Sequence, residues 1–102
     1  MMAVIIRIPA ALQPFTGGRA RVELAASPTT VGDALAALWA VHPGIRDRVV
    51  NEQGEVREHV NVFAGNESIR FTGGLATPVS DGTEISIVPA VSGGSERRTR
   101  AS

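Results

Sequence analysis

The first residues of the chain alternate between apolar and other side chains with the period of a half-buried β-strand. Val4, Ile6 and Ile8 fall on one face of this segment. A Gly-Gly pair at 17–18 then offers a turn, and residues 21–24 alternate again. The two segments predict a β-hairpin with a long connection.

A helix is predicted over residues 31–42. Thr30 has a side chain suited to cap its first turn, and Asp33 adds an acid there, as in a short capping box. The apolar residues that follow recur at helical spacing and form one face: Val31, Leu35, Leu38 and Trp39. Pro43-Gly44 ends the helix, so one apolar face is available to pack on a sheet.

Further extended segments follow the helix. Residues 60–64 alternate with Phe63 facing outward, residues 68–71 form a short extended piece, and residues 84–88 form the last strand. The order of a hairpin, one helix and further strands predicts an α+β fold with one mixed sheet and the main helix across one face. If the first and last strands pair in parallel in the middle, the fold is a β-grasp.

Composition sets the class of protein. The chain has 102 residues, 43% of them hydrophobic and 20% charged, which suits one domain, expected over residues 1–92. There is no cysteine, so disulfides and thiolate metal sites are excluded. The apolar stretch at 3–6 is too short for a signal or membrane segment, so no membrane partner and a cytoplasmic location are expected.

Charge is distributed unevenly along the chain. Residues 1–94 carry seven arginines against nine acids, whereas residues 95–102 carry three arginines against one acid. A nucleic-acid-binding body normally shows a basic face, so no nucleic-acid partner is expected.

The Gly-Gly pair at 93–94 differs from the other two such pairs, which lie between predicted elements. It comes after the last strand and is followed only by a polar stretch without periodicity, residues 95–102. Glycine has no Cβ, so such a pair can enter a narrow channel. This position indicates a projecting functional end.

The run Ile-Val-Pro-Ala-Val-Ser-Gly-Gly at 87–94 resembles the C-terminus of the ubiquitin-like sulfur carriers, which include the small subunit of molybdopterin synthase and the thiamin sulfur carrier. The run at 71–77 and the Asp81-Gly82 turn are most similar to the carrier that serves cysteine biosynthesis from O-phosphoserine. The resemblance covers about residues 3–94.

This resemblance implies a function for the chain end. Gly94 becomes the covalent sulfur attachment point, and Gly93 gives access to it. An E1-like adenylating and sulfurtransferase enzyme uses ATP to convert the Gly94 carboxylate to a thiocarboxylate, and a cysteine-synthase-like sulfhydrylase receives the sulfur. The carrier itself is then no enzyme, holds no cofactor and has no catalytic residue.

Residues 95–102 depart from the family pattern, because most members end at the second glycine. The resemblance implies that a zinc-dependent metalloprotease cleaves between Gly94 and Ser95 and removes this tail. The competing interpretation is a remnant of cloning, although no familiar tag is visible.

Other candidate sites have simpler explanations. His42 and His59 lack a third metal ligand at useful spacing, so no metal site is expected. The sequence register does place Ile5, Phe63 and Val88 outward on three adjacent strands, which predicts a cross-strand row on which a partner docks. Two alternatives to a cysteine-pathway carrier stay open: the molybdopterin synthase small subunit, and a ubiquitin-like binding module without sulfur chemistry.

Overall fold

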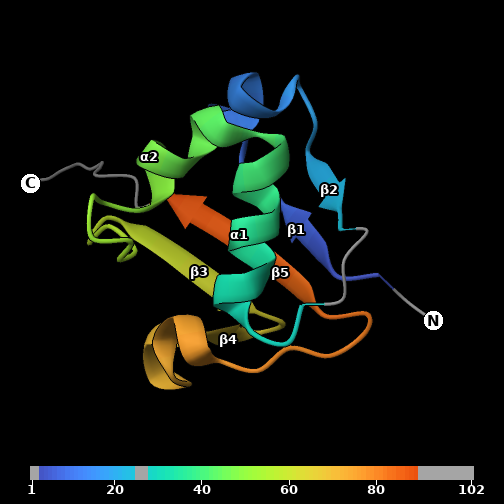
Figure 1. Cartoon of the computed structure of the whole chain (residues 1–102), viewed down its shortest axis with the longest axis vertical. Coiled ribbons are helices and arrows are strands. Elements are labelled where there is room, and N and C mark those ends of the chain that lie inside the picture. The colour runs from blue at the N-terminus through green and yellow to red at the C-terminus, as the bar shows by residue number, and fades with distance from the viewer. Residues whose placement is uncertain (1–2, 25–27, 90–102) are drawn as a thin grey trace, which may run out of the picture.

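The computed structural model describes residues 3–24 and 28–89. The strands and α-helices are β1 (Ile5–Arg7), β2 (Arg21–Glu23), α1 (Val31–Val41), α2 (Arg46–Val49), β3 (Val60–Ala64), β4 (Glu67–Ser68) and β5 (Glu84–Pro89). Four 3₁₀ helices join them: η1 (Ala10–Thr16), η2 (Pro43–Ile45), η3 (Ile69–Phe71) and η4 (Gly74–Ala76). Figure 1 shows α1 lying across one face of a single sheet.

The strands form one mixed sheet in the order β2-β1-β5-β3-β4. β1 is antiparallel to β2 and parallel to β5, and β5 is antiparallel to β3. A parallel pair needs a crossover, which the segment containing α1 supplies. The predicted α+β class and β-grasp fold are confirmed.

The core lies between α1 and the sheet. Alternate residues of the central strands point into it, including Ile6, Val62 and Ile85, each at most 1% exposed. The helix contributes a stripe of buried residues at the predicted spacing: Val31, Ala34, Leu35 and Leu38. The alternation in the sequence therefore assigned the strand faces correctly.

The helix begins as the sequence predicts, with a variation. The backbone N–H of Asp33 donates to the Thr30 hydroxyl at 3.1 Å. The Asp33 carboxylate accepts a bond from the Thr29 hydroxyl at 2.9 Å. This bond and those from Thr30 lower the pKa of Asp33. The helix ends at Val41, and His42 is the residue that follows it.

Two connections are more ordered than their sequences indicate. Between β1 and β2 the chain forms η1, and the buried Thr16 hydroxyl bonds the carbonyls of Gln13 and Arg19. After β3, only the start of the predicted extended piece at 68–71 is a strand, and the rest is η3.

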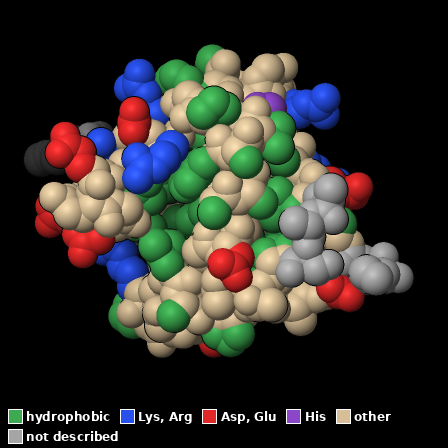
Figure 2. Space-filling model, viewed as in Figure 1, with side chains coloured by type: hydrophobic (Ala, Val, Ile, Leu, Met, Phe, Trp, Pro, Cys, Tyr) green, Lys and Arg blue, Asp and Glu red, His purple; other side chains and the backbone are tan. Residues whose placement is uncertain are grey.

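The η4 segment is held close to the helix. A Cβ on Gly32 would lie 3.1 Å from the carbonyl oxygen of Leu75, so glycine permits this approach. The Thr77 hydroxyl also donates to the carbonyl of Gly74 at 2.7 Å. These contacts fix one wall of the hollow seen beside α1 in Figure 2.

Candidate functional site

The described part of the chain ends with β5, the strand that leads to the predicted functional end. Gly93, Gly94 and Ser95 lie outside the described residues. β5 lies between β1 and β3, and Pro89, its last residue, is paired with Val60. β5 therefore ends in the middle of the sheet, beside the start of β3 (Figure 1).

The three residues predicted to form a docking surface lie on the sheet face opposite α1. Ile5 and Phe63 are partly buried, and Val88 is 43% exposed. Each has a buried neighbour along its strand that points into the core. The structure thus places all three on the predicted face.

The predicted cross-strand row is wrong in detail. Phe63 is paired with Ser86, Val88 with Asn61, and Ile5 with Glu84. The three apolar residues are therefore staggered over three rows. Alternation along one strand determines which face a residue occupies, but the offset between strands depends on the loops that join them.

Polar residues separate the apolar ones on this face, and the sequence interpretation overlooked their part in it. The pairs place Arg7 and Phe63 on either side of Ser86 in one row. Arg7 also makes an exposed ion pair with Glu84 at 3.4 Å. Parallel pairing of the first and last strands indicates that Arg7 lies on this face beside β5, but the register that pairs it with Ser86 has no signal in the sequence.

A shallow depression follows β1 and β5 toward the point where β5 ends. It has a volume of about 310 Å³ and is lined by Arg7, Ile8, Pro9, Ser86, Ile87 and Val88. Its lining combines one cation with apolar side chains and contains no acid. The surface beside the last residues of β5 is therefore mixed, with a cation next to apolar side chains.

The histidines do not form a metal site within the described segments. His42 follows the C-terminal end of α1, and His59 is exposed before β3. Residues 3–24 and 28–89 contain no group of three or more side chains arranged to bind a metal ion. In the same segments, no helix has the length and hydropathy to cross a membrane.

Comparison with known proteins identifies relatives of this fold and sequence. The sequence model of the ThiS family matches residues 6–94. The sulfur carrier protein CysO of Mycobacterium tuberculosis is 40% identical over 95 residues, covering 91% of this chain and all of that protein.

Solved structures show the same relationship. A chain in the crystal structure of the Amycolatopsis orientalis BexX/CysO complex has a TM-score of 0.82 and 38% identity, covering 90% of this chain and 100% of that chain. The crystal structure of Mycobacterium tuberculosis CysO has a TM-score of 0.78 and 39% identity, covering 86% and 99%. Sequence, sheet topology and chain coverage agree that this chain belongs to the ThiS family of ubiquitin-like sulfur carriers.

Proposed function

We propose that this protein carries sulfur as a thiocarboxylate on Gly94 and donates it in the biosynthesis of cysteine. The observation that supports this most strongly is the extent of the family match, which ends at residue 94, the second glycine of the pair. The 40% identity to CysO, a sulfur carrier protein, favours the same chemistry.

The proposed chemistry needs an activating partner, because a carboxylate is a poor electrophile until its oxygen leaves easily. An E1-like enzyme supplies ATP: the Gly94 carboxylate attacks the α-phosphorus, and pyrophosphate leaves. A sulfur nucleophile then displaces AMP and leaves sulfur on the Gly94 carbonyl carbon. Gly93 and Gly94 suit this passage, since neither carries a Cβ to obstruct the approach to the nucleotide.

Residues 95–102 must be removed before this chemistry, because in the uncut chain Gly94 has no free carboxylate. A zinc-dependent metalloprotease that cleaves between Gly94 and Ser95 would produce the active end. The family match supports such a boundary, since it ends at residue 94.

The test is reconstitution with the E1-like enzyme, ATP and a sulfide donor, followed by mass spectrometry of the intact protein. A chain ending at Gly94 is expected to gain the mass of one oxygen replaced by sulfur. The full chain is expected to gain it only after the metalloprotease is added. A matched chain ending at Gly93 controls for nonspecific reaction, and an unmodified chain ending at Gly94 would contradict the proposal.

The thiocarboxylate form of the protein is also used to test which molecule accepts the sulfur. Adding O-phosphoserine and its sulfhydrylase to the thiocarboxylate is expected to yield cysteine. Conversion of a molybdopterin precursor instead, with no cysteine formed, would favour the alternative subunit role.

We extend the proposal to the staggered sheet face of Ile5, Phe63 and Val88, which adjoins β5 and so lies beside the emerging chain end. The activating enzyme docks there. Phe63→Asp places a charge in the apolar part of this face and is expected to reduce thiocarboxylate formation. Phe71→Asp is the matched control, because Phe71 is 88% exposed on η3, outside this face. Equal activity of the two folded variants would rule out this dock.

A further inference from the structure

The proposed sulfur chemistry does not use a groove on the α1 side of the molecule. It has a volume of about 510 Å³ and lies between residues 55–62 and the η3–η4 segment. We call it the β3 groove. Five apolar side chains line it: Val56, Val60, Val62, Ile69 and Leu75. Figure 2 shows hydrophobic side chains in the hollow beside α1, with arginine side chains above and below it and acidic side chains farther out on the left.

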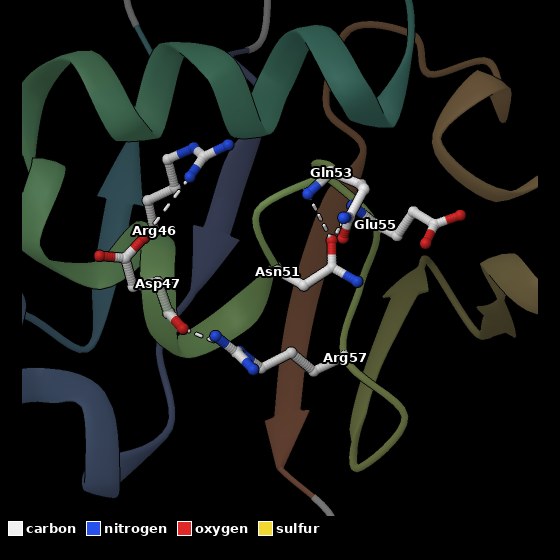
Figure 3. A network of polar contacts seen from close by, with 6 residues as sticks. All are labelled: Arg46, Asp47, Asn51, Gln53, Glu55 and Arg57. Atoms are coloured by element: carbon white, nitrogen blue, oxygen red, sulfur yellow. Dashed lines mark hydrogen bonds and ion pairs between the residues drawn. The ribbon is translucent and has the colours of Figure 1, made fainter.

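Two carboxylates belong to the β3 groove, and neither forms an ion pair with the described parts of the chain. Glu55 and Glu58 line the groove and are exposed. The ion pairs among the described residues involve neither of them. In Figure 3, the Glu55 side chain extends away from Asn51, which binds the backbone N–H and carbonyl of Glu55 but not its carboxylate.

Two arginines lie at or near these carboxylates, and both bind backbone oxygens. Arg70 lines the groove and donates to the carbonyls of Glu58 and Val60 at 2.8 and 3.2 Å. Arg57 directs its Nε to the carbonyl of Asp47 at 2.8 Å (Figure 3). Both guanidinium groups remain charged but form no ion pair with Glu55 or Glu58, so the groove lining carries two carboxylates against the one cation of Arg70.

The segment best placed to supply complementary charge is the basic tail of the uncut chain. Arg97, Arg98 and Arg100 provide three cations against one acid in residues 95–102. The register pairs Pro89 with Val60, a groove residue, so β5 ends about one strand spacing, roughly 5 Å, from the groove. Arg97 follows Pro89 by eight residues, a reach of up to roughly 26 Å.

From this geometry we propose that, before cleavage, residues 95–102 fold back onto the β3 groove, with their arginines against Glu55 and Glu58. Exposed ion pairs are individually weak. The tail is attached to its site, however, and an effective concentration on the order of millimolar lets a weak contact be populated. Both ends of the Gly93-Gly94 pair are then tethered, so the uncut chain presents a closed loop where the trimmed chain presents a free end.

The proposal does not depend on the sulfur chemistry, and NMR of the isolated protein tests it. Amide shifts of the full chain are compared with those of a chain ending at Gly94. We expect differences at Glu55–Glu58 and at the η3–η4 segment. Raising the salt from about 0.1 M to about 1 M shortens the Debye length from ~10 Å to ~3 Å, and these differences should then shrink.

Matched variants test which charged residues hold the tail on the groove. Glu55→Gln with Glu58→Gln in the full chain should reproduce the groove shifts of the trimmed chain, allowing for local effects at the substituted residues. Glu23→Gln, which changes an exposed acid on β2 away from the groove, should leave the tail-dependent differences intact. Replacing Arg97, Arg98 and Arg100 together by serine should abolish them at constant tail length.

A spin label gives an independent measurement. The chain has no cysteine, so Ser102→Cys creates a single attachment position. A nitroxide there should broaden amides along the β3 groove more than those of β2. Shift differences confined to the end of β5, or groove broadening that requires high protein concentration and so reflects a second copy, would overturn the proposal.

Discussion

Thr29 and Thr30 each form a different hydrogen bond with Asp33 at the start of α1. Thr30 accepts from the backbone N–H of Asp33, while Thr29 donates to the Asp33 carboxylate. The sequence pattern predicted the first bond and the acid in the first turn. The second could not be predicted, because the capping box assigns the acid a backbone partner and the preceding threonine competes for it.

The Asp33 carboxyl titration tests this arrangement. Hydrogen bonds to its charged form, that from the Thr29 hydroxyl first, lower the pKa of Asp33 in the folded protein. The group therefore stabilises the fold above its unfolded-state pKa, and the contribution is lost as pH falls through the folded-state pKa. Thr29→Val is expected to raise the pKa of Asp33 toward that of an ordinary aspartate.

Carboxyl-detected NMR measures this directly. Thr83→Val is a suitable control, because the Thr83 hydroxyl bonds Ser80 near the start of β5 and does not contact α1. An Asp33 pKa that stays unchanged in Thr29→Val would contradict the role given to the Thr29 hydroxyl.

At the scale of elements, α1 holds the sheet through one face only. Leu38 is fully buried, whereas Val41 on the same helix is 65% exposed. Leu38→Ala removes buried side-chain volume from the core and is expected to lower the free energy of unfolding by about 2–5 kcal/mol. Val41→Ala, at an exposed position of the same helix, should change the free energy of unfolding by no more than about 0.5 kcal/mol.

Urea unfolding followed by circular dichroism compares the two variants. Similar midpoints for both would show that α1 does not pack through Leu38 as described.

Elements defined by periodicity were predictable, and those defined by local hydrogen bonds were not. The alternation at Val60 and Val62 assigned β3 and its buried face. The 3₁₀ segments carry no such period. The hydrogen bonds of the buried Thr16 hydroxyl hold η1, and the Ser68 hydroxyl caps η3 by accepting from the backbone N–H of Arg70. The β3 groove escaped sequence analysis for the same reason, since η3 and η4 form one of its walls.

At the scale of the whole molecule, the sequence predicts which strands are neighbours in the sheet. It does not predict which residues of those strands lie opposite one another. Parallel pairing of β1 with β5 follows from the order of elements and the crossover rule. The stagger of Ile5, Phe63 and Val88 does not, because register depends on connections whose geometry the pattern leaves undetermined. The family resemblance leads to the proposal for Gly94 without either detail.

The parallel pairing of β1 and β5 also determines how the molecule bears mechanical load. Force that pulls the end of β5 away from the start of β1 acts in opposite directions along two neighbouring strands. Their hydrogen bonds are then loaded together in shear, and β3 holds β5 from its other side. A pull on the chain that follows β5 therefore acts on a strand paired along both edges, so the proposed activating enzyme would draw the chain end against the most strongly held strand of the sheet.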